Sequence, residues 1–96
     1  MSAYIVARVD VDDPALLKDY LAATPPIIEK YRGRFIVRGG STVTLEGPPE
    51  SRRIVIIEFP DMADAKAFYN SKEYSEVRKL REAVSVAEFI AVDGIK

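Results

Sequence analysis

Three segments of the chain are apolar at both odd and even positions instead of alternating with polar residues. They are residues 3–9, 54–59 and 84–92. A strand with one wet side alternates with a period of two, whereas a strand covered on both sides is an almost continuous apolar run. We therefore expect strands at these three places, in a sheet with both faces covered.

The segment after the first strand shows helical periodicity. Asp13 before Pro14 is typical of a helix start, because a carboxylate caps free N–H groups and proline fits the first helical position. Two consecutive prolines then interrupt the apolar stripe. We expect two helical pieces, residues 14–23 and 25–31, with Gly33 in the left-handed conformation that ends many helices.

The middle of the chain predicts a hairpin. Residues 34–38 form its first strand, and 53–59 its second. Residues 42–45 either continue this first strand or form a separate short strand. The pair Gly39-Gly40 indicates a bulge or kink rather than a phosphate-binding loop, because no helix follows it.

The second helical region predicts the fold. It begins at Asp61, breaks at Ser71, which can cap a new helix, and continues over residues 72–83. The order β-α-β-β-α-β is the ferredoxin-like α+β arrangement, an antiparallel four-stranded sheet with both helical regions on one face. Since these helices cover one face only, we expect a second copy to cover the other.

The composition and net charge of the chain limit the classes of partner that we expect. The chain has 96 residues, 48% of them apolar and 30% charged, and a net charge of −1. We expect one domain over residues 1–96 and neither nucleic acid nor a membrane surface as partner. There is no apolar run long enough to span a membrane, no signal-peptide pattern and no cysteine, which together favour the cytoplasm.

The chain lacks histidine as well as cysteine. This excludes thiol nucleophiles, the usual zinc sites and haem held by histidine, and a haem-handling protein would need a tyrosine ligand. We expect no metal and no cofactor. Any catalysis would be proton transfer, isomerisation or cofactor-free oxygenation, with tyrosine or Glu58 carrying the proton and arginine stabilising an oxyanion.

Tyrosine and arginine side chains on the otherwise apolar sides of the expected helices and strands suggest a ligand-binding site. They form either an amphipathic core or the wall of a pocket between helices and sheet. An inward arginine needs an anionic partner, which could be Glu58, Glu88, or a ligand with a carboxylate, phosphate or enolate oxygen. The candidate ligand-binding residues are Tyr20, Arg38, Glu58, Tyr69, Tyr74 and Arg81.

An ordered set of short motifs covers almost the whole chain. It comprises residues 3–11, Tyr20, Pro26, Tyr31, Gly33, Arg34, VRGG at 37–40, LEG at 45–47, IEFP at 57–60, Ala65, Tyr69, NSKEY at 70–74 and Arg81. The set resembles the DUF1330 family, with tyrosine at position 69 where that family usually has tryptophan. The resemblance implies a dimeric α+β barrel, in which two sheets close across the dimer interface. That superfamily contains cofactor-independent monooxygenases, lactone isomerases and haem-handling enzymes, and DUF1330 itself has no established reaction.

Two functions remain. One is a cytoplasmic homodimer that binds a small anionic or aromatic molecule in a helix–sheet pocket and acts as a cofactor-independent enzyme or as a binder. The alternative is a non-catalytic dimeric interaction module whose own side chains fill the pocket. A cavity lined by the tyrosines and arginines would favour the first.

Overall fold

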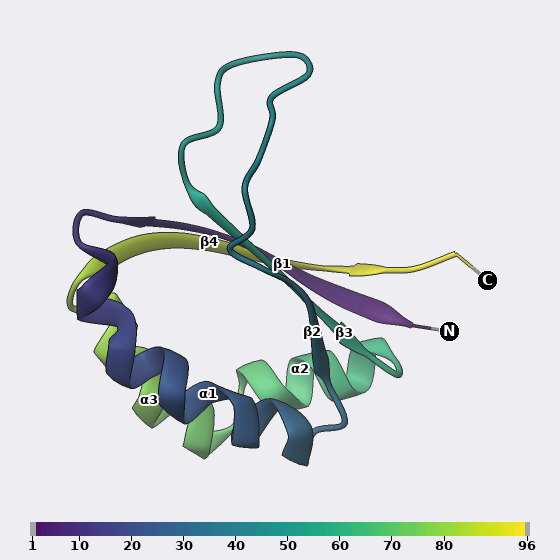
Figure 1. The fold of residues 1–96 in the computed structure, drawn as a ribbon. Helices are drawn as coiled ribbons and strands as arrows, with labels where there is room; N and C mark the ends of the chain where they lie inside the picture. The colour runs from purple at the N-terminus through teal and green to yellow at the C-terminus, as the bar shows by residue number, and fades with distance from the viewer. Residues whose placement is uncertain (1, 96) are drawn as a thin grey trace.

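The computed structural model describes residues 2–95, which form one antiparallel sheet with helices on one face (Figure 1). The strands are β1 (Ala3–Val11), β2 (Arg34–Arg38), β3 (Arg53–Phe59) and β4 (Ser85–Asp93). Their order in the sheet is β2-β3-β1-β4. This confirms the ferredoxin-like α+β fold expected from the order of elements.

The helical layer consists of a 3-10 helix, η1 (Pro14–Leu17), followed by α1 (Lys18–Lys30), α2 (Met62–Tyr69) and α3 (Lys72–Glu82). The three predicted caps are confirmed. Asp13 Oδ1 accepts a hydrogen bond from the Ala15 N–H at 3.0 Å, and Asp61 Oδ1 accepts one from the Asp64 N–H at 2.8 Å. Ser71 Oγ accepts one from the Tyr74 N–H at 3.0 Å, so the break between α2 and α3 is also where we expected it.

The expected break of the first helix at its proline pair is wrong, because α1 runs through Pro25 and Pro26. Proline has no N–H, so Pro25 leaves the carbonyl of Leu21 without its usual helical partner. Arg38 of β2 supplies the missing donor, since its Nη2 donates to the Leu21 oxygen at 2.9 Å. A side chain of another element therefore satisfies the carbonyl that the proline leaves free.

Two other local expectations are corrected. The left-handed residue after α1 is Arg32, with φ of 66°, and not Gly33. Gly33 instead has no side chain because the Phe59 ring occupies the place of a Cβ atom. Residues 42–45 are not a strand but part of a long connection, residues 39–52, which we call the β2–β3 loop. The bulge lies between Phe35 and Val37, ahead of the glycine pair.

The two faces of the sheet differ in burial. Alternate side chains of β1, from Ala3 to Val9, are buried against the helices, where they join a core built around Phe59, Phe68 and Tyr74. The opposite, outer face has no covering layer within residues 2–95 (Figure 1). Its apolar side chains on β4 are 75% (Val86), 57% (Ile90) and 47% (Val92) exposed.

None of the helices described here is long and apolar enough to cross a membrane.

Candidate functional site

A small cavity lies between the helices and the inner face of the sheet. Its volume is about 30 Å³, which is room for a water molecule or two. Its aromatic wall is formed by Tyr20, Phe35 and Phe89. Its other lining residues are apolar apart from Thr24 and three arginines, and no Asp or Glu from the described part of the chain lines it.

The three arginines of the cavity are Arg38, Arg53 and Arg81. The chain contains eight arginines. The other five each form an ion pair with a carboxylate; they are Arg8, Arg32, Arg34, Arg52 and Arg78. Within residues 2–95, the cavity arginines form no ion pair. Every arginine without a carboxylate partner in this range therefore lies at the same cavity.

Arg81 is the most deeply placed of the three. It projects from α3 and is only 5% exposed. Its guanidinium carbon lies 4.7 Å from the centre of the Phe89 ring and 5.8 Å from that of Tyr20. Its Nε–H is buried and has no hydrogen-bond acceptor among the described residues. A buried cation with an unsatisfied N–H and no carboxylate partner is costly, and an anion in the cavity would offset that cost.

A pair of phenols adjoins Arg81. The hydroxyl oxygens of Tyr20 and Tyr74 lie 2.6 Å apart and share one hydrogen bond. Burial raises the pKa of Tyr74, the neighbouring Tyr20 raises it further, and Arg81 lowers it in part. Tyr74 therefore remains a neutral phenol. If Tyr74 donates to Tyr20, the proton of Tyr20 is free to bind a ligand in the cavity.

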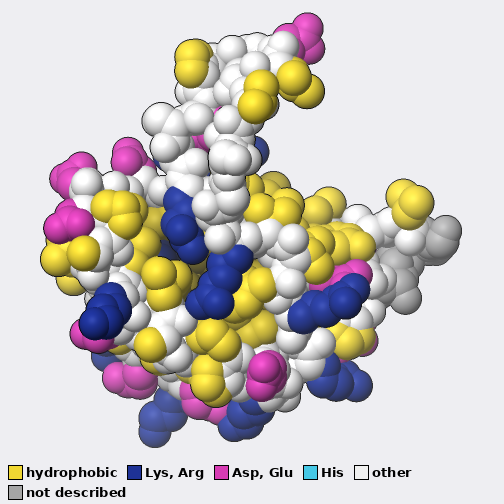
Figure 2. All heavy atoms as spheres, viewed as in Figure 1, with side chains coloured by type: hydrophobic (Ala, Val, Ile, Leu, Met, Phe, Trp, Pro, Cys, Tyr) yellow, Lys and Arg dark blue, Asp and Glu magenta, His cyan; other side chains and the backbone are white. Residues whose placement is uncertain are grey.

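The other two arginines flank the β2–β3 loop. Arg38 is exposed, donates to Leu21 on α1, and lies 4.3 Å from the centre of the Phe35 ring. Arg53 Nη2 donates to the Arg38 oxygen at 3.5 Å, and its guanidinium occupies the space beside Gly39, whose φ is +73°. Figure 2 shows basic side chains gathered beside apolar surface where this loop meets the body.

Arg53 was not among the residues expected from the sequence. The sequence did contain a signal for its inward position. Arg53 lies two residues before Val55 and four before Ile57 on β3, so all three side chains are on the face toward the helices. A basic residue in phase with buried ones is a candidate for an inward position. Its proximity to Arg38 and Arg81 is a tertiary property that alternation does not show.

Of the six candidates, Tyr20, Arg38 and Arg81 line the cavity. Tyr74 does not line it and reaches it only through its hydrogen bond with Tyr20, and the other two candidates lie elsewhere. Tyr69 lines a surface groove that Arg81 also borders, and its ring lies 5.6 Å from that of Tyr74. Glu58 lies on the outer face of the sheet, where it accepts a hydrogen bond from Arg34 Nε at 2.7 Å. That bond is the main cause of the lowered pKa of Glu58.

The structural ion pair considered for the inward arginines is not formed. Glu58 pairs with Arg34, and Glu88 pairs with Arg52. Neither acid pairs with Arg38 or Arg81 in the part of the chain that the structure describes. Arg38 instead donates to the Leu21 oxygen, and Arg81 has no carboxylate partner within residues 2–95.

The comparisons with known proteins concern the whole chain. The model of DUF1330, a domain of unknown function, matches residues 2–95. No curated protein matches the sequence. Among solved structures, a protein of unknown function from Rhodopseudomonas palustris superposes with a TM-score of 0.76 at 20% identity, over 99% of this chain and 83% of that one.

Two further structures have the same fold. SnoaB, a cofactor-independent oxygenase from Streptomyces nogalater, has a TM-score of 0.71 at 17% identity, covering 99% of this chain and 94% of its own. A dimeric ferredoxin-like protein of unknown function from Bacteroides fragilis has a TM-score of 0.67 at 14% identity, covering 97% and 96%. At such identities the similarity shows the fold alone.

Proposed function

Because the chain belongs to the DUF1330 family, a domain of unknown function, we propose its function from the geometry of its cavity. The protein is a homodimer in which each subunit binds a small organic anion between helices and sheet. The observation that carries this proposal is the position of the arginines, since Arg38, Arg53 and Arg81 line one cavity without a carboxylate.

The cavity favours a compact acid with an apolar or aromatic body. Its volume of about 30 Å³ is enough for the oxygens of a carboxylate at Arg81 but not for a whole organic acid, so the body of the ligand would stay at the surface, beside the exposed Arg38. Guanidinium groups bind such oxygens by charge-assisted hydrogen bonds. The body of the ligand would lie toward Arg38 and Arg53, along the ring of Phe35.

A cofactor-independent enzyme is the stronger form of this proposal. Arg81 would stabilise an enolate or carboxylate oxygen, and Tyr20 would donate a hydrogen bond to that oxygen while accepting one from Tyr74, whose raised pKa keeps it protonated. SnoaB has the same fold and is a cofactor-independent oxygenase, which makes this chemistry a reasonable one to assay. No acid of residues 2–95 lines the cavity to act as a base, so the substrate would have to be readily deprotonated.

One observation favours the alternative, a non-catalytic dimeric module with a self-filled pocket. The hydroxyls of Tyr20 and Tyr74 satisfy each other, and Arg38 already bonds the Leu21 oxygen. The cavity is also small. Under this alternative, the protein binds no anion.

Titration with acetate, benzoate and inorganic phosphate separates the two functions. We expect saturable binding of at least one carboxylate, with one site per subunit, seen by calorimetry and by a shift of the Arg81 Nε–H signal in NMR. Arg81→Met should abolish binding. Arg32→Met, which removes an exposed arginine paired with Asp64, should not. Absence of binding by the unmodified protein would favour the alternative.

The homodimer is supported by the outer face of the sheet. Val6 lies opposite Ile56 on β3 and Ile90 on β4, which makes an apolar row across three strands. Exposed apolar patches of this kind mark association sites. Two ferredoxin-like structures with the same fold, from Bacteroides fragilis and from a Jannaschia species, are dimeric. We propose that this chain pairs through the same face, sheet on sheet.

A further inference from the structure

The β2–β3 loop stands clear of the rest of the molecule. Figure 1 shows it rising from the sheet on the side opposite the helices, and Figure 2 shows hydrophobic side chains along it. Val43 is 82% exposed and Leu45 is 93% exposed. A single exposed apolar residue is ordinary. Two on one projecting loop, above an uncovered apolar sheet face, indicate a surface that is buried on association.

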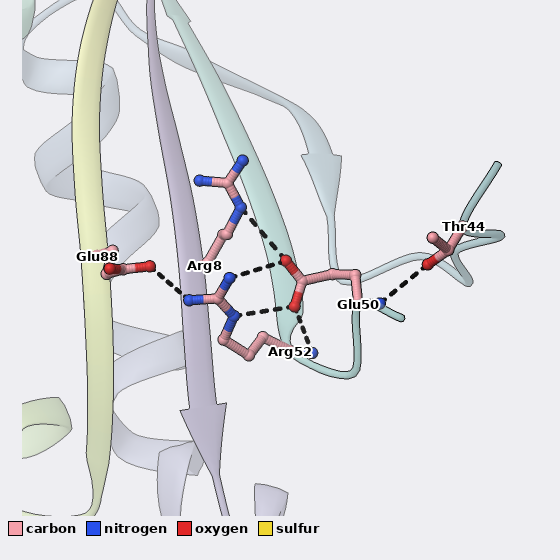
Figure 3. A network of polar contacts seen from close by, with 5 residues as sticks. All are labelled: Arg8, Thr44, Glu50, Arg52 and Glu88. Atoms are coloured by element: carbon pink, nitrogen blue, oxygen red, sulfur yellow. Dashed lines mark hydrogen bonds and ion pairs between the residues drawn. The ribbon is translucent and has the colours of Figure 1, made fainter. Parts of the chain in front are cut away.

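Polar contacts fix the base of this loop to the outer face (Figure 3). Arg52 forms a bidentate pair with Glu50, at 2.9 Å and 3.0 Å, and also pairs with Glu88 of β4. Arg8 of β1 lies 3.3 Å from Glu50. The Glu50 N–H donates to Thr44 Oγ1 at 2.9 Å, which ties the two legs of the loop together.

The contacts of Glu50 persist well below neutral pH. The hydrogen bonds from Arg52 lower the pKa of Glu50 to about 2. Glu50 is therefore ionised at neutral pH, and the network loses its anionic centre only as the pH falls toward that value. The network holds the loop in one orientation before any partner binds, which reduces the entropy that association costs.

The charges of the outer face favour a second copy over a charged partner. Two arginines and two glutamates of the network cancel, as do Arg34 and Glu58. An interface with two-fold symmetry brings the same patch of both subunits together, so an unbalanced charge would repel itself. The paired charges leave the apolar row itself neutral, so two copies can meet along it. Asp10, which is exposed and lies opposite Val86 at one end of the outer face, forms no ion pair within residues 2–95 and adds one negative charge per subunit there.

We propose that residues 40–49 form a dimerisation arm, in which Val43 and Leu45 of each subunit pack against the other subunit. The inference rests on the proposed sheet-on-sheet dimer. A partner placed on the outer face must lie beside the arm, because the arm rises on that side (Figure 1). Two-fold symmetry makes both arms engage at once. Pro48 and Pro49 restrict the returning leg, so ordering it costs little entropy.

The test compares dimer dissociation constants measured by sedimentation velocity over a range of concentrations. V43S/L45S removes the apolar side chains of the arm and leaves the outer face intact. We expect it to raise the dissociation constant by about 100-fold or more, because four apolar side chains per dimer lose their buried surface. Leu16→Ser is the matched control, since Leu16 is 54% exposed in the helical layer, and its dissociation constant should not change.

The outcomes distinguish the arm from the dimer itself. If the unmodified protein is a monomer, both the dimer and the arm are wrong. If it is a dimer and V43S/L45S dissociates at the same concentration, the arm is wrong and the sheet-on-sheet dimer stands. Circular dichroism of V43S/L45S should be that of the unmodified chain, which shows that weaker association does not come from unfolding.

A second measurement reports on the arm directly. The chain has no cysteine, so Leu45→Cys carries a single environment-sensitive fluorophore. Its emission should shift to shorter wavelength over the same concentration range in which the dimer forms. The same dye at Leu16→Cys should not shift. Emission from position 45 that stays constant while the dimer forms would overturn the proposal.

Discussion

Arg81 combines deep burial with the lack of a carboxylate partner among residues 2–95. Its cation lies between the rings of Phe89 and Tyr20, which recover part of the desolvation cost through their negative faces. A buried charge without a partner lowers the stability of the ligand-free protein. Such residues are typical of binding sites, where a ligand supplies the missing interactions.

We therefore expect Arg81→Met to stabilise the ligand-free protein. Methionine fills similar volume without a buried charge, and such replacements raise the free energy of unfolding by about 1–3 kcal/mol. Urea denaturation in buffer without carboxylate or phosphate measures this. Added acetate should then stabilise the unmodified protein and leave Arg81→Met unchanged. A variant less stable than the unmodified chain would show that Arg81 is structural.

At the scale of elements, α1 depends on β2. The proline pair removes two helical N–H donors, and the Arg38 guanidinium replaces one of them at Leu21. Arg38 is the last residue of β2, directly before the β2–β3 loop. It therefore contacts α1, lines the cavity and adjoins the loop.

Arg38→Met should therefore loosen the middle of α1. The Leu21 oxygen loses its donor, at a cost of about 1 kcal/mol because the site is partly wet. Hydrogen exchange should accelerate for the amides of Ile27 and Ile28, which follow the prolines, and not for those of α3. Lys18→Met, at the exposed start of α1, is the control. Unchanged exchange in α1 would mean that water satisfies the Leu21 oxygen equally well.

For the whole molecule, the uncovered sheet face is the dominant feature. Ile56 is half-buried and lies in the apolar row with Val6. Sedimentation should give about twice 10.7 kDa for the unmodified protein. Ile56→Asp should give a monomer with a lower melting temperature, because an unpaired carboxylate would otherwise be buried between sheets. Glu76→Ala, on the exposed side of α3, should remain a dimer of unchanged stability.

A dimeric Ile56→Asp would place the interface elsewhere. Association should also affect the melting temperature, because the proposed dimer would complete the burial of Ile56. The melting temperature of the unmodified protein should therefore rise with protein concentration, and that of Ile56→Asp should not.

Local chemistry was enough to predict the elements and their order. Asp13, Asp61 and Ser71 act through backbone groups two or three residues away, and strand patterns reflect the two faces of the strand itself. Such signals are short-range, so the ferredoxin-like fold could be read from the chain alone.

Tertiary structure alone decided what depends on distant contacts. The sequence indicates a helix break at Pro25, but α1 continues through it, and Arg38 of β2 bonds the carbonyl that the proline leaves without a donor. Gly33 looks like a helix end but is required by Phe59. Inward placement of Arg81 could be predicted, and so could the outward placement of Glu58, which is out of phase with the inward residues of β3. The convergence of Arg81 with Arg38 and Arg53 could not. Periodicity shows which side of its own element a residue faces, and only packing shows which residues of other elements it meets.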